Sequence, residues 1–142
     1  MFNPSRDQAR RFFVEAWRKH GERLPLTPME HVAADIVAMH PEYHDLLGDA
    51  ERALALDFTP EGGQLNPFLH LSLHLAVAEQ LSIDQPPGIV AAFRGLTLRK
   101  ADRHDALHEV LECLGETVWR AQRDGTPPDG EAYLECLRRR AS

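Results

Sequence analysis

Six of the eight histidines in this 142-residue chain fall into pairs spaced four residues apart. Imidazole titrates near neutral pH and is the commonest metal ligand in proteins. On a helix, residues i and i+4 are neighbours with ~5–6 Å between their Cβ atoms, so that two imidazoles can converge on one cation. The spacing therefore indicates metal coordination as the first chemistry to consider at three pairs: His40 and His44, His70 and His74, and His104 and His108.

The pair His70 and His74 lies in the most apolar stretch of the chain, between Asn66 and Leu81. On a helix of ~100° per residue the two imidazoles share one face with aliphatic side chains, about 40° apart. In a strand the same two residues would be about 13 Å apart, too far for one ion. The pattern predicts that His70 and His74 point inward and are the main ligands of a metal site.

The other candidates come from neighbouring segments. His40 continues the apolar stripe of a predicted helix that starts at Pro28, although Pro41 interrupts the helical geometry between His40 and His44. A later predicted helix, 102–124, carries His108 and Glu112 four residues apart, and His104 of the same helix lies nearer the core. We expect His40 and His108 to complete the site, with three alternative ligands: His44, His104 and Glu112.

The predicted cofactor is one divalent metal ion: zinc, iron or manganese. Helical bundles build internal sites for these metals from histidines and carboxylates on facing helices. In kind, the arrangement resembles hemerythrin-like and DinB-like bundles, but the spacings do not reproduce either family's complete pattern. The carboxylate content is also low for a di-iron site. If a coordination position stays open, the ion could activate water or bind oxygen, and the sequence does not choose between these.

Other catalytic chemistry has little support. The sequence has no Ser-His-Asp order, Walker loop, GxGxxG or HExxH motif, so catalytic residues are not assigned and the question of enzymatic activity stays open. Cys113 and Cys136 lack CxxC spacing and are too few for a disulfide framework, so we expect two reduced, partly buried thiols.

Composition restricts the class of protein further. With 22 acidic and 16 basic residues the net charge is −6, which argues against nucleic acid as a partner, and we expect the arginines near the two ends to lie on solvated faces. A hydrophobic fraction of 43% is globular. No segment approaches ~20 uninterrupted apolar residues and no secretory signal begins the chain, so we expect a cytoplasmic protein without membrane contact.

Capping and breaking residues predict an all-α fold. Ser5, the Thr27 to Glu30 capping box and Asn66 are helix starts, while Gly21 and Gly125 are helix ends. The segment after Asn66 also alternates like a strand, but it is about sixteen residues long and no partner strand is predicted, which favours a helix. The expected architecture is one domain, 1–142, a compact bundle of about five to seven helices. Helices are predicted at 5–20, 28–39, 49–56, 66–81, 87–100, 102–124 and from 129, with a separate short turn of helix at 41–47 and a loop at 59–63.

Several phrases of the sequence resemble a bacterial family, the domain of unknown function 1841. They are FNPSR at 2–6, LTPME at 26–30, HPEYH at 40–44, NPFLHLSLHLAVAEQLSIDQPPGI at 66–89, ECLGE at 112–116 and PPDGEAYLECLRRR at 127–140. The resemblance covers essentially the whole chain. It implies a small intracellular protein with no assigned activity, cofactor or catalytic residue, so no residue's role can be transferred.

A second hypothesis belongs to a different class, a non-catalytic interaction or structural module. In it the histidines are core side chains that hydrogen-bond backbone carbonyls or carboxylates. A protein partner would contact the turn Gln85 to Gly88 or the arginine-rich ends, and a homo-oligomer is a further option. The sequence leaves both hypotheses open.

Overall fold

The computed structural model describes residues 6–55, 66–100 and 102–142. Its internal contacts divide the chain into two compact units, Met1–Leu75 and Ala76–Ser142. The expectation that residues 1–142 form one domain stays a prediction.

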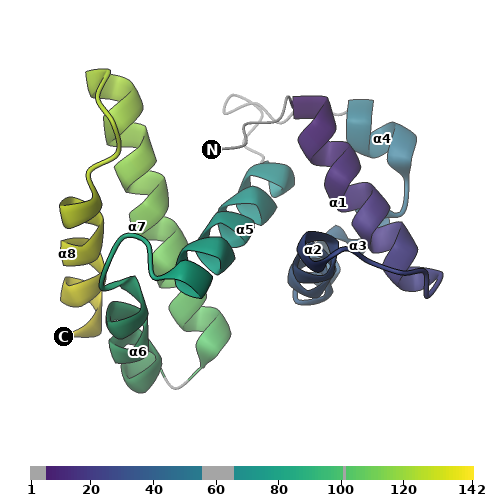
Figure 1. The fold of residues 1–142 in the computed structure, drawn as a ribbon. Helices are drawn as coiled ribbons and strands as arrows, with labels where there is room; N and C mark the ends of the chain where they lie inside the picture. The colour runs from purple at the N-terminus through teal and green to yellow at the C-terminus, as the bar shows by residue number, and fades with distance from the viewer. Residues whose placement is uncertain (1–5, 56–65, 101) are drawn as a thin grey trace. The chain divides into compact units, whose positions relative to one another are not determined.

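The predicted all-α fold is confirmed, and the described residues contain no strand. The described residues form eight α-helices, slightly more than the five to seven expected, because the short turn expected at 41–47 contains a separate helix. The helices, labelled in Figure 1, are α1 (Arg6–Gly21), α2 (Pro28–Ala38), α3 (His44–Leu47), α4 (Ala50–Ala55), α5 (Pro67–Ile83), α6 (Ile89–Lys100), α7 (Arg103–Asp124) and α8 (Gly130–Ala141), with a 3-10 turn η1 at Pro41–Tyr43. The predicted cap Ser5, the end at Leu56 and the loop at 59–63 lie outside the described residues.

The predicted capping box at the start of α2 is present. The backbone N–H of Glu30 donates to the Thr27 hydroxyl at 3.1 Å, and the Glu30 carboxylate accepts from the Thr27 N–H at 3.0 Å. The same carboxylate pairs with Lys19 near the end of α1, at 2.9 Å. One side chain therefore satisfies an otherwise unpaired N–H at the start of α2 and also connects α2 to α1.

The chain leaves helical geometry at His40, as Pro41 predicts. His40 has φ −126° and ψ 70°, and η1 and α3 follow as a separate short helical segment that ends at Gly48. A proline disfavours the helical conformation of the residue before it because its ring crowds that residue's backbone. The break lets the His40 ring take a direction that a continuous α2 would not give it.

The segment after Asn66, whose sequence also alternates like a strand, forms the helix α5. The Asn66 side chain caps it by accepting from the backbone N–H groups of Phe68, at 2.9 Å, and Leu69, at 3.3 Å. The helical hydrogen bonds satisfy the backbone internally, which an unpaired strand could not do. As a result, His70 and His74 lie one turn apart on the same side of α5.

The core of the first unit packs α1 and α2 against each other and against the start of α5. It contains buried side chains from these three helices and from α3, including Phe13, Val37, Leu47, Phe68 and Leu71. Figure 1 shows α4 beside α1, and the buried Arg10 on α1 donates to the carbonyl of Ala53 on α4 at 2.9 Å. The Arg10 guanidinium also lies over the Phe68 ring, 4.9 Å from its centroid, so this cation contacts α4 and α5 together.

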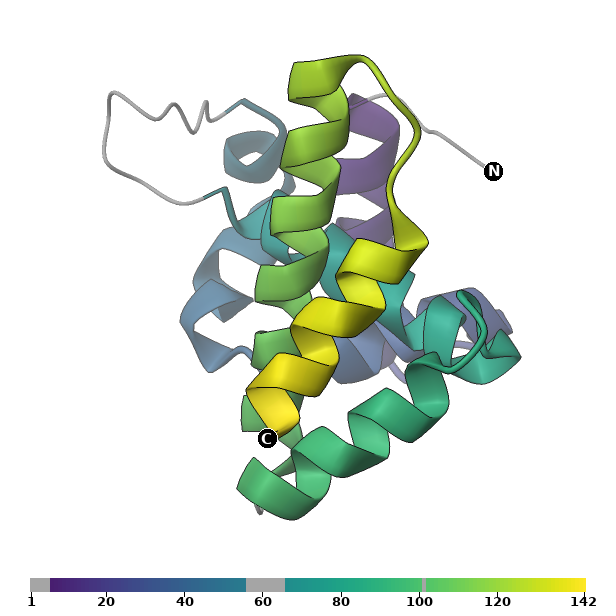
Figure 2. The ribbon, with the colours of Figure 1, turned by 90° about the vertical axis from the view of Figure 1, so that its left-hand side faces the viewer.

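In the second unit α6, α7 and α8 pack on one another, and α8 runs back along α7 (Figures 1 and 2). Gly125 ends α7 in the left-handed conformation with φ 65°, and Asp129 caps α8 by accepting from the Ala132 N–H. The core between these helices is aliphatic and aromatic. Its most buried members include Ile89, Leu96, Val110, Tyr133 and Leu137.

The expectation of two reduced thiols is wrong. Cys113 on α7 and Cys136 on α8 form a disulfide, with a Cα–Cα distance of 5.9 Å, and the structure holds no free cysteine. The reason is the hairpin of α7 and α8, which places two residues that are 23 apart in sequence at a distance that a disulfide spans.

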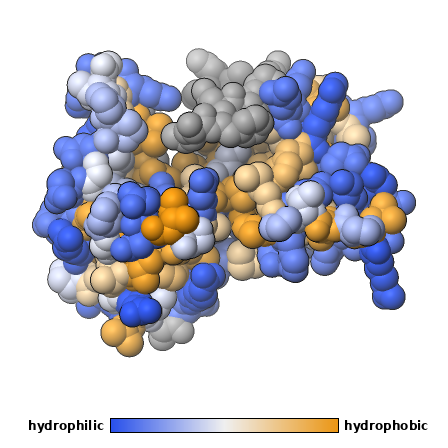
Figure 3. Space-filling model, viewed as in Figure 1, coloured by the Kyte–Doolittle hydropathy of each residue, from blue (hydrophilic) through white to orange (hydrophobic). Residues whose placement is uncertain are grey.

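Hydrophilic residues cover much of α1 and α8 on the face shown in Figure 3, in keeping with the solvated surface expected from the sequence. None of the helices in the described part of the chain is both long enough and apolar enough to pass through a lipid bilayer.

The capping box gives a stability prediction. We expect Thr27→Ala to lower the free energy of unfolding by ~1 kcal/mol, because the N–H of Glu30 loses its acceptor. Urea unfolding monitored by circular dichroism measures the change. Thr97→Ala is the matched control, since that hydroxyl only donates to the Arg94 carbonyl within α6. Equal unfolding free energies for Thr27→Ala and wild type would contradict the role assigned to the cap.

Candidate functional site

Three of the predicted ligands come together within the first unit. The rings of His40, His70 and His74 face one another edge to face, with centroid distances of 5.0 Å for His40 and His70, 4.7 Å for His40 and His74, and 4.8 Å for His70 and His74. Each offers a ring nitrogen within 4.8 Å of the others. We call these three residues the histidine cluster.

Hydrogen bonds fix the orientation of His40. Its Nδ1–H donates to the carbonyl oxygen of Ile36 at 2.7 Å, because a carbonyl can only accept. In the neutral ring Nε2 is then the acceptor, and it lies 3.1 Å from Nε2 of His70, which donates. The Ile36 carbonyl belongs to the last turn of α2, so the same break at Pro41 that redirects His40 keeps its ring over that turn.

The distance between Nε2 of His40 and Nε2 of His70 suits coordination of one ion by both rings. Two nitrogen ligands at ~2.0–2.1 Å from a tetrahedral zinc ion lie roughly 3.3 Å apart. The 3.1 Å between the two Nε2 atoms is close to that value, and His74 offers a ring nitrogen within 4.8 Å of those of His40 and His70. Metal-ligating histidines commonly donate their other N–H to a backbone carbonyl, as His40 does here.

The cluster is shielded from water to different extents. His40 is 1% exposed and His74 is 3% exposed, while His70 is half-buried. The approach from solvent is therefore on the side of His70.

Tyr43 is a component of the site that the sequence analysis missed. Its ring stacks on His40 at 5.5 Å with an interplanar angle of 7°, and its centroid is 6.2 Å from that of His70. Burial raises the pKa of the Tyr43 phenol, with a smaller contribution from Glu42. The sequence signal that could have identified Tyr43 is its position three residues after His40, across the single turn of η1.

His44 makes its contacts outside the histidine cluster. Its Nε2–H donates to the Val37 carbonyl at 2.9 Å, and its ring stacks on Trp17 at 4.5 Å. His44 therefore supports the packing of α3 on α1. It was expected as an alternative ligand, and the structure gives it another set of contacts because Pro41 separates its direction from that of His40.

The candidates on α7 belong to the second unit. His104 and His108 are half-buried, and their rings meet at 4.2 Å with an interplanar angle of 61°. Glu112 is exposed and pairs with Arg140, which also pairs with Glu109. Glu112 was expected as an alternative ligand, but an arginine of α8 engages its carboxylate. His20 and His31 are exposed.

The ion pairs around Arg140 give a pH prediction. The Arg140 guanidinium, and then the Lys100 ammonium at 3.1 Å, hold the pKa of the Glu109 carboxyl below its usual range. A lowered folded-state pKa stabilises the fold above the ordinary value of ~4.3, and the stabilisation is lost as pH falls through the folded value.

We expect Glu109→Gln to lower the free energy of unfolding at pH 7 by ~0.5–1 kcal/mol, a partly exposed ion pair being screened by solvent. Its free energy of unfolding will also fall less than that of wild type between pH 6 and pH 3. Urea titrations at each pH measure both effects, with the exposed Glu131→Gln as control. Parallel pH profiles for Glu109→Gln and wild type would refute the assignment.

Comparison with known proteins gives one match. No curated protein and no solved structure matches the chain. The family model described as a domain of unknown function, DUF1841, matches residues 5–139. This range contains the histidine cluster, α7 and both cysteines, as the phrases quoted from the sequence predict. The chain therefore belongs to the DUF1841 family.

Proposed function

We propose that the protein binds one divalent metal ion at the histidine cluster. The observation that carries the proposal is the convergence of three imidazoles from two segments, with ring nitrogens within 4.8 Å and two of the rings almost wholly buried. Imidazole ligands suit zinc and iron, whereas manganese prefers oxygen ligands. The three nitrogens therefore favour zinc or iron over manganese, the third metal that the sequence left open.

The hydrogen bond between His40 and His70 identifies where the ion would bind. The proton on Nε2 of His70 now joins the two rings. A divalent ion would replace that proton, and His70 would adopt the tautomer protonated at Nδ1, with both Nε2 lone pairs directed at the ion. His40 already has the required tautomer because of Ile36.

The fourth coordination position separates two kinds of site. With three protein ligands, zinc retains a position for water and can lower that water's pKa, whereas four protein ligands make a closed structural site. The sequence predicts His108 as the fourth ligand, and that part of the proposal rests on the sequence alone. The protein is then a metal-binding protein whose class, hydrolytic or structural, depends on this one residue.

The alternative function is a module whose histidines serve only as hydrogen-bonding core residues. One observation favours it: His40 has both ring nitrogens hydrogen-bonded without any ion, to Ile36 and His70. Glutamine can retain hydrogen bonds at these positions, but it is a poor ligand for zinc. His74→Gln and His40→Gln therefore separate the two functions better than alanine variants.

The test is metal binding by untagged protein. We expect wild type to bind one zinc or ferrous ion per chain, measured by elemental analysis after gel filtration, and to gain ~2.7 kcal/mol of stability at a metal concentration 100 times the dissociation constant. His40→Gln, His70→Gln and His74→Gln should each weaken binding at least 100-fold. His31→Gln, an exposed histidine beside Asp35, should bind as wild type does.

Two results would contradict the proposal. One is the absence of stoichiometric uptake by the wild type, and the other is unchanged affinity in the His40→Gln and His74→Gln variants, with the helical circular dichroism signal retained. The His108→Gln variant decides the fourth ligand: a loss comparable to that of His74→Gln indicates a closed site, and an unchanged affinity indicates three protein ligands.

A further inference from the structure

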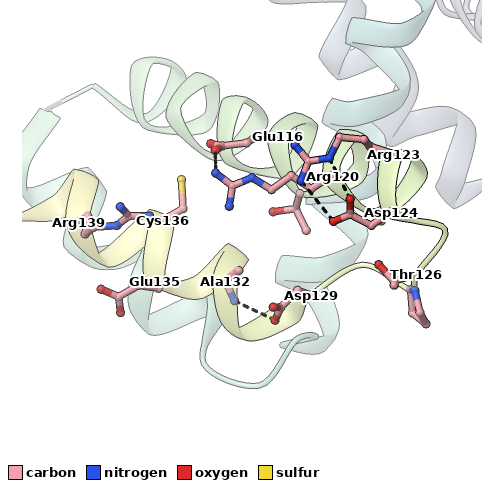
Figure 4. A pocket seen from close by; sticks show the side chains of 13 residues that line it. Glu116, Arg120, Arg123, Asp124, Thr126, Asp129, Ala132, Glu135, Cys136 and Arg139 are labelled. Carbon is pink, nitrogen blue, oxygen red and sulfur yellow. Dashed lines mark hydrogen bonds and ion pairs between the residues drawn. The ribbon is translucent and has the colours of Figure 1, made fainter.

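A groove of about 430 Å³ runs between α7 and α8 in the second unit (Figure 4). This volume is within the ~300–1,000 Å³ typical of small-molecule sites. Cys136 of the disulfide belongs to its wall, together with Arg120 of α7 and Arg139 of α8. In the view of Figure 4, the sulfur lies between the side chains of these two arginines.

The two halves of the disulfide differ in access. Cys113 is 0% exposed, whereas Cys136 is 8% exposed and lines the groove. Cys136 is therefore the half of the disulfide that a molecule in the groove can contact, since Cys113 is not among the residues that line it. Redox-active disulfides commonly present one accessible sulfur to the attacking thiolate, and the other sulfur then leaves.

The charges near Cys136 define the class of molecule. A second cavity of about 340 Å³ shares part of this wall and is lined by Arg120, Arg139 and Arg140, with Glu116 as its one carboxylate. Glu116 pairs with Arg120, and Arg140 pairs with Glu109 and Glu112. Arg139 is exposed and, in the part of the chain that the structure describes, forms no ion pair.

Arg139 is therefore available to a ligand, and a guanidinium binds a carboxylate through two parallel hydrogen bonds. The larger groove has four acidic lining residues. Asp124 and Asp129 lie toward the loop between α7 and α8 and are engaged by Arg123 and by the N–H of Ala132, whereas Glu116 and Glu135 lie near Cys136. Cys136 also lines the second cavity, where three arginines face one carboxylate, and this cavity is thus the part that attracts an anion.

We propose that the Cys113–Cys136 disulfide is a redox-active site that exchanges with a small carboxylate-bearing thiol held by Arg139. The proposal is independent of the metal site, because all of its residues lie on α7 and α8. The thiolate attacks Sγ of Cys136, a mixed disulfide forms, the bond to Cys113 breaks, and Cys113 leaves as a thiolate that takes up a proton.

A second molecule of the thiol then attacks the sulfur of the first, and Cys136 leaves as a thiolate. In total, two small thiols are oxidised to one small disulfide, and the protein disulfide is reduced to two thiols. The reverse sequence oxidises the protein with the small disulfide, so the direction depends on the ratio of the two forms.

The first experiment determines which sulfur reacts. Cys113→Ser retains only the Cys136 thiol, and Cys136→Ser retains only the Cys113 thiol. Both variants lack the disulfide, so their rates can be compared directly. With oxidised glutathione as the probe, intact-mass spectrometry should show the mixed disulfide forming at least 10-fold faster at Cys136. Equal rates, or faster reaction at Cys113, would overturn the proposal.

The second experiment tests the carboxylate with the crosslink intact. We expect reduced glutathione to reduce wild type 3–10-fold faster than its diethyl ester does, at equal thiolate concentration. Arg139→Gln should remove this preference, while leaving the rate with uncharged 2-mercaptoethanol unchanged. Arg138→Gln, the neighbouring exposed arginine that does not line the groove, is the control.

A wild-type rate that is the same for the acid and the ester overturns the assignment of the ligand class. The same conclusion follows if Arg138→Gln and Arg139→Gln act alike. Reduction that occurs only as the circular dichroism signal of the helices disappears would show that the thiol reaches the disulfide through unfolding, and would exclude the groove as its site.

Discussion

The position of His40 depends on a steric constraint, the exclusion of helical geometry immediately before Pro41. Because α2 cannot continue through His40, the imidazole turns back over the last turn of its own helix and donates to Ile36. The ring then stacks on Tyr43 and reaches His70. A histidine within a continuous helix would point its ring along that helix's own face, so the cluster exists because the helix stops here.

The first unit positions the other two imidazoles by different means. Asn66 fixes the start of α5, which sets the rotation of His70 and His74 about the helix axis. Arg10 contacts both α4 and α5 from α1, so a buried cation helps to hold the segment that bears these histidines. Burying a guanidinium is costly unless it is hydrogen-bonded, and the bond to the Ala53 carbonyl offsets part of that cost.

Local signals predicted most of the fold, because caps and breakers act within one turn of the chain. Thr27, Asn66, Asp102 and Asp129 each accept hydrogen bonds at the helix starts they predict, and Gly125 ends α7. Contacts between distant segments were harder to predict. The spacing of His40 and His44 favours a pair, yet the backbone break sends one ring to α5 and the other to Trp17.

The disulfide shows the same limitation, since neither cysteine has a local signal for pairing and the hairpin of α7 and α8 had to be known first. Its crosslink has a consequence for the unfolded chain. Joining residues 23 apart removes loop conformations from the denatured ensemble, and this raises the free energy of that state. Both cysteines lie within Ala76–Ser142, and residues 1–75 contain none. The entropy of one half of the chain is therefore restrained covalently, whereas the other half must offset its full conformational entropy through packing and hydrogen bonds alone.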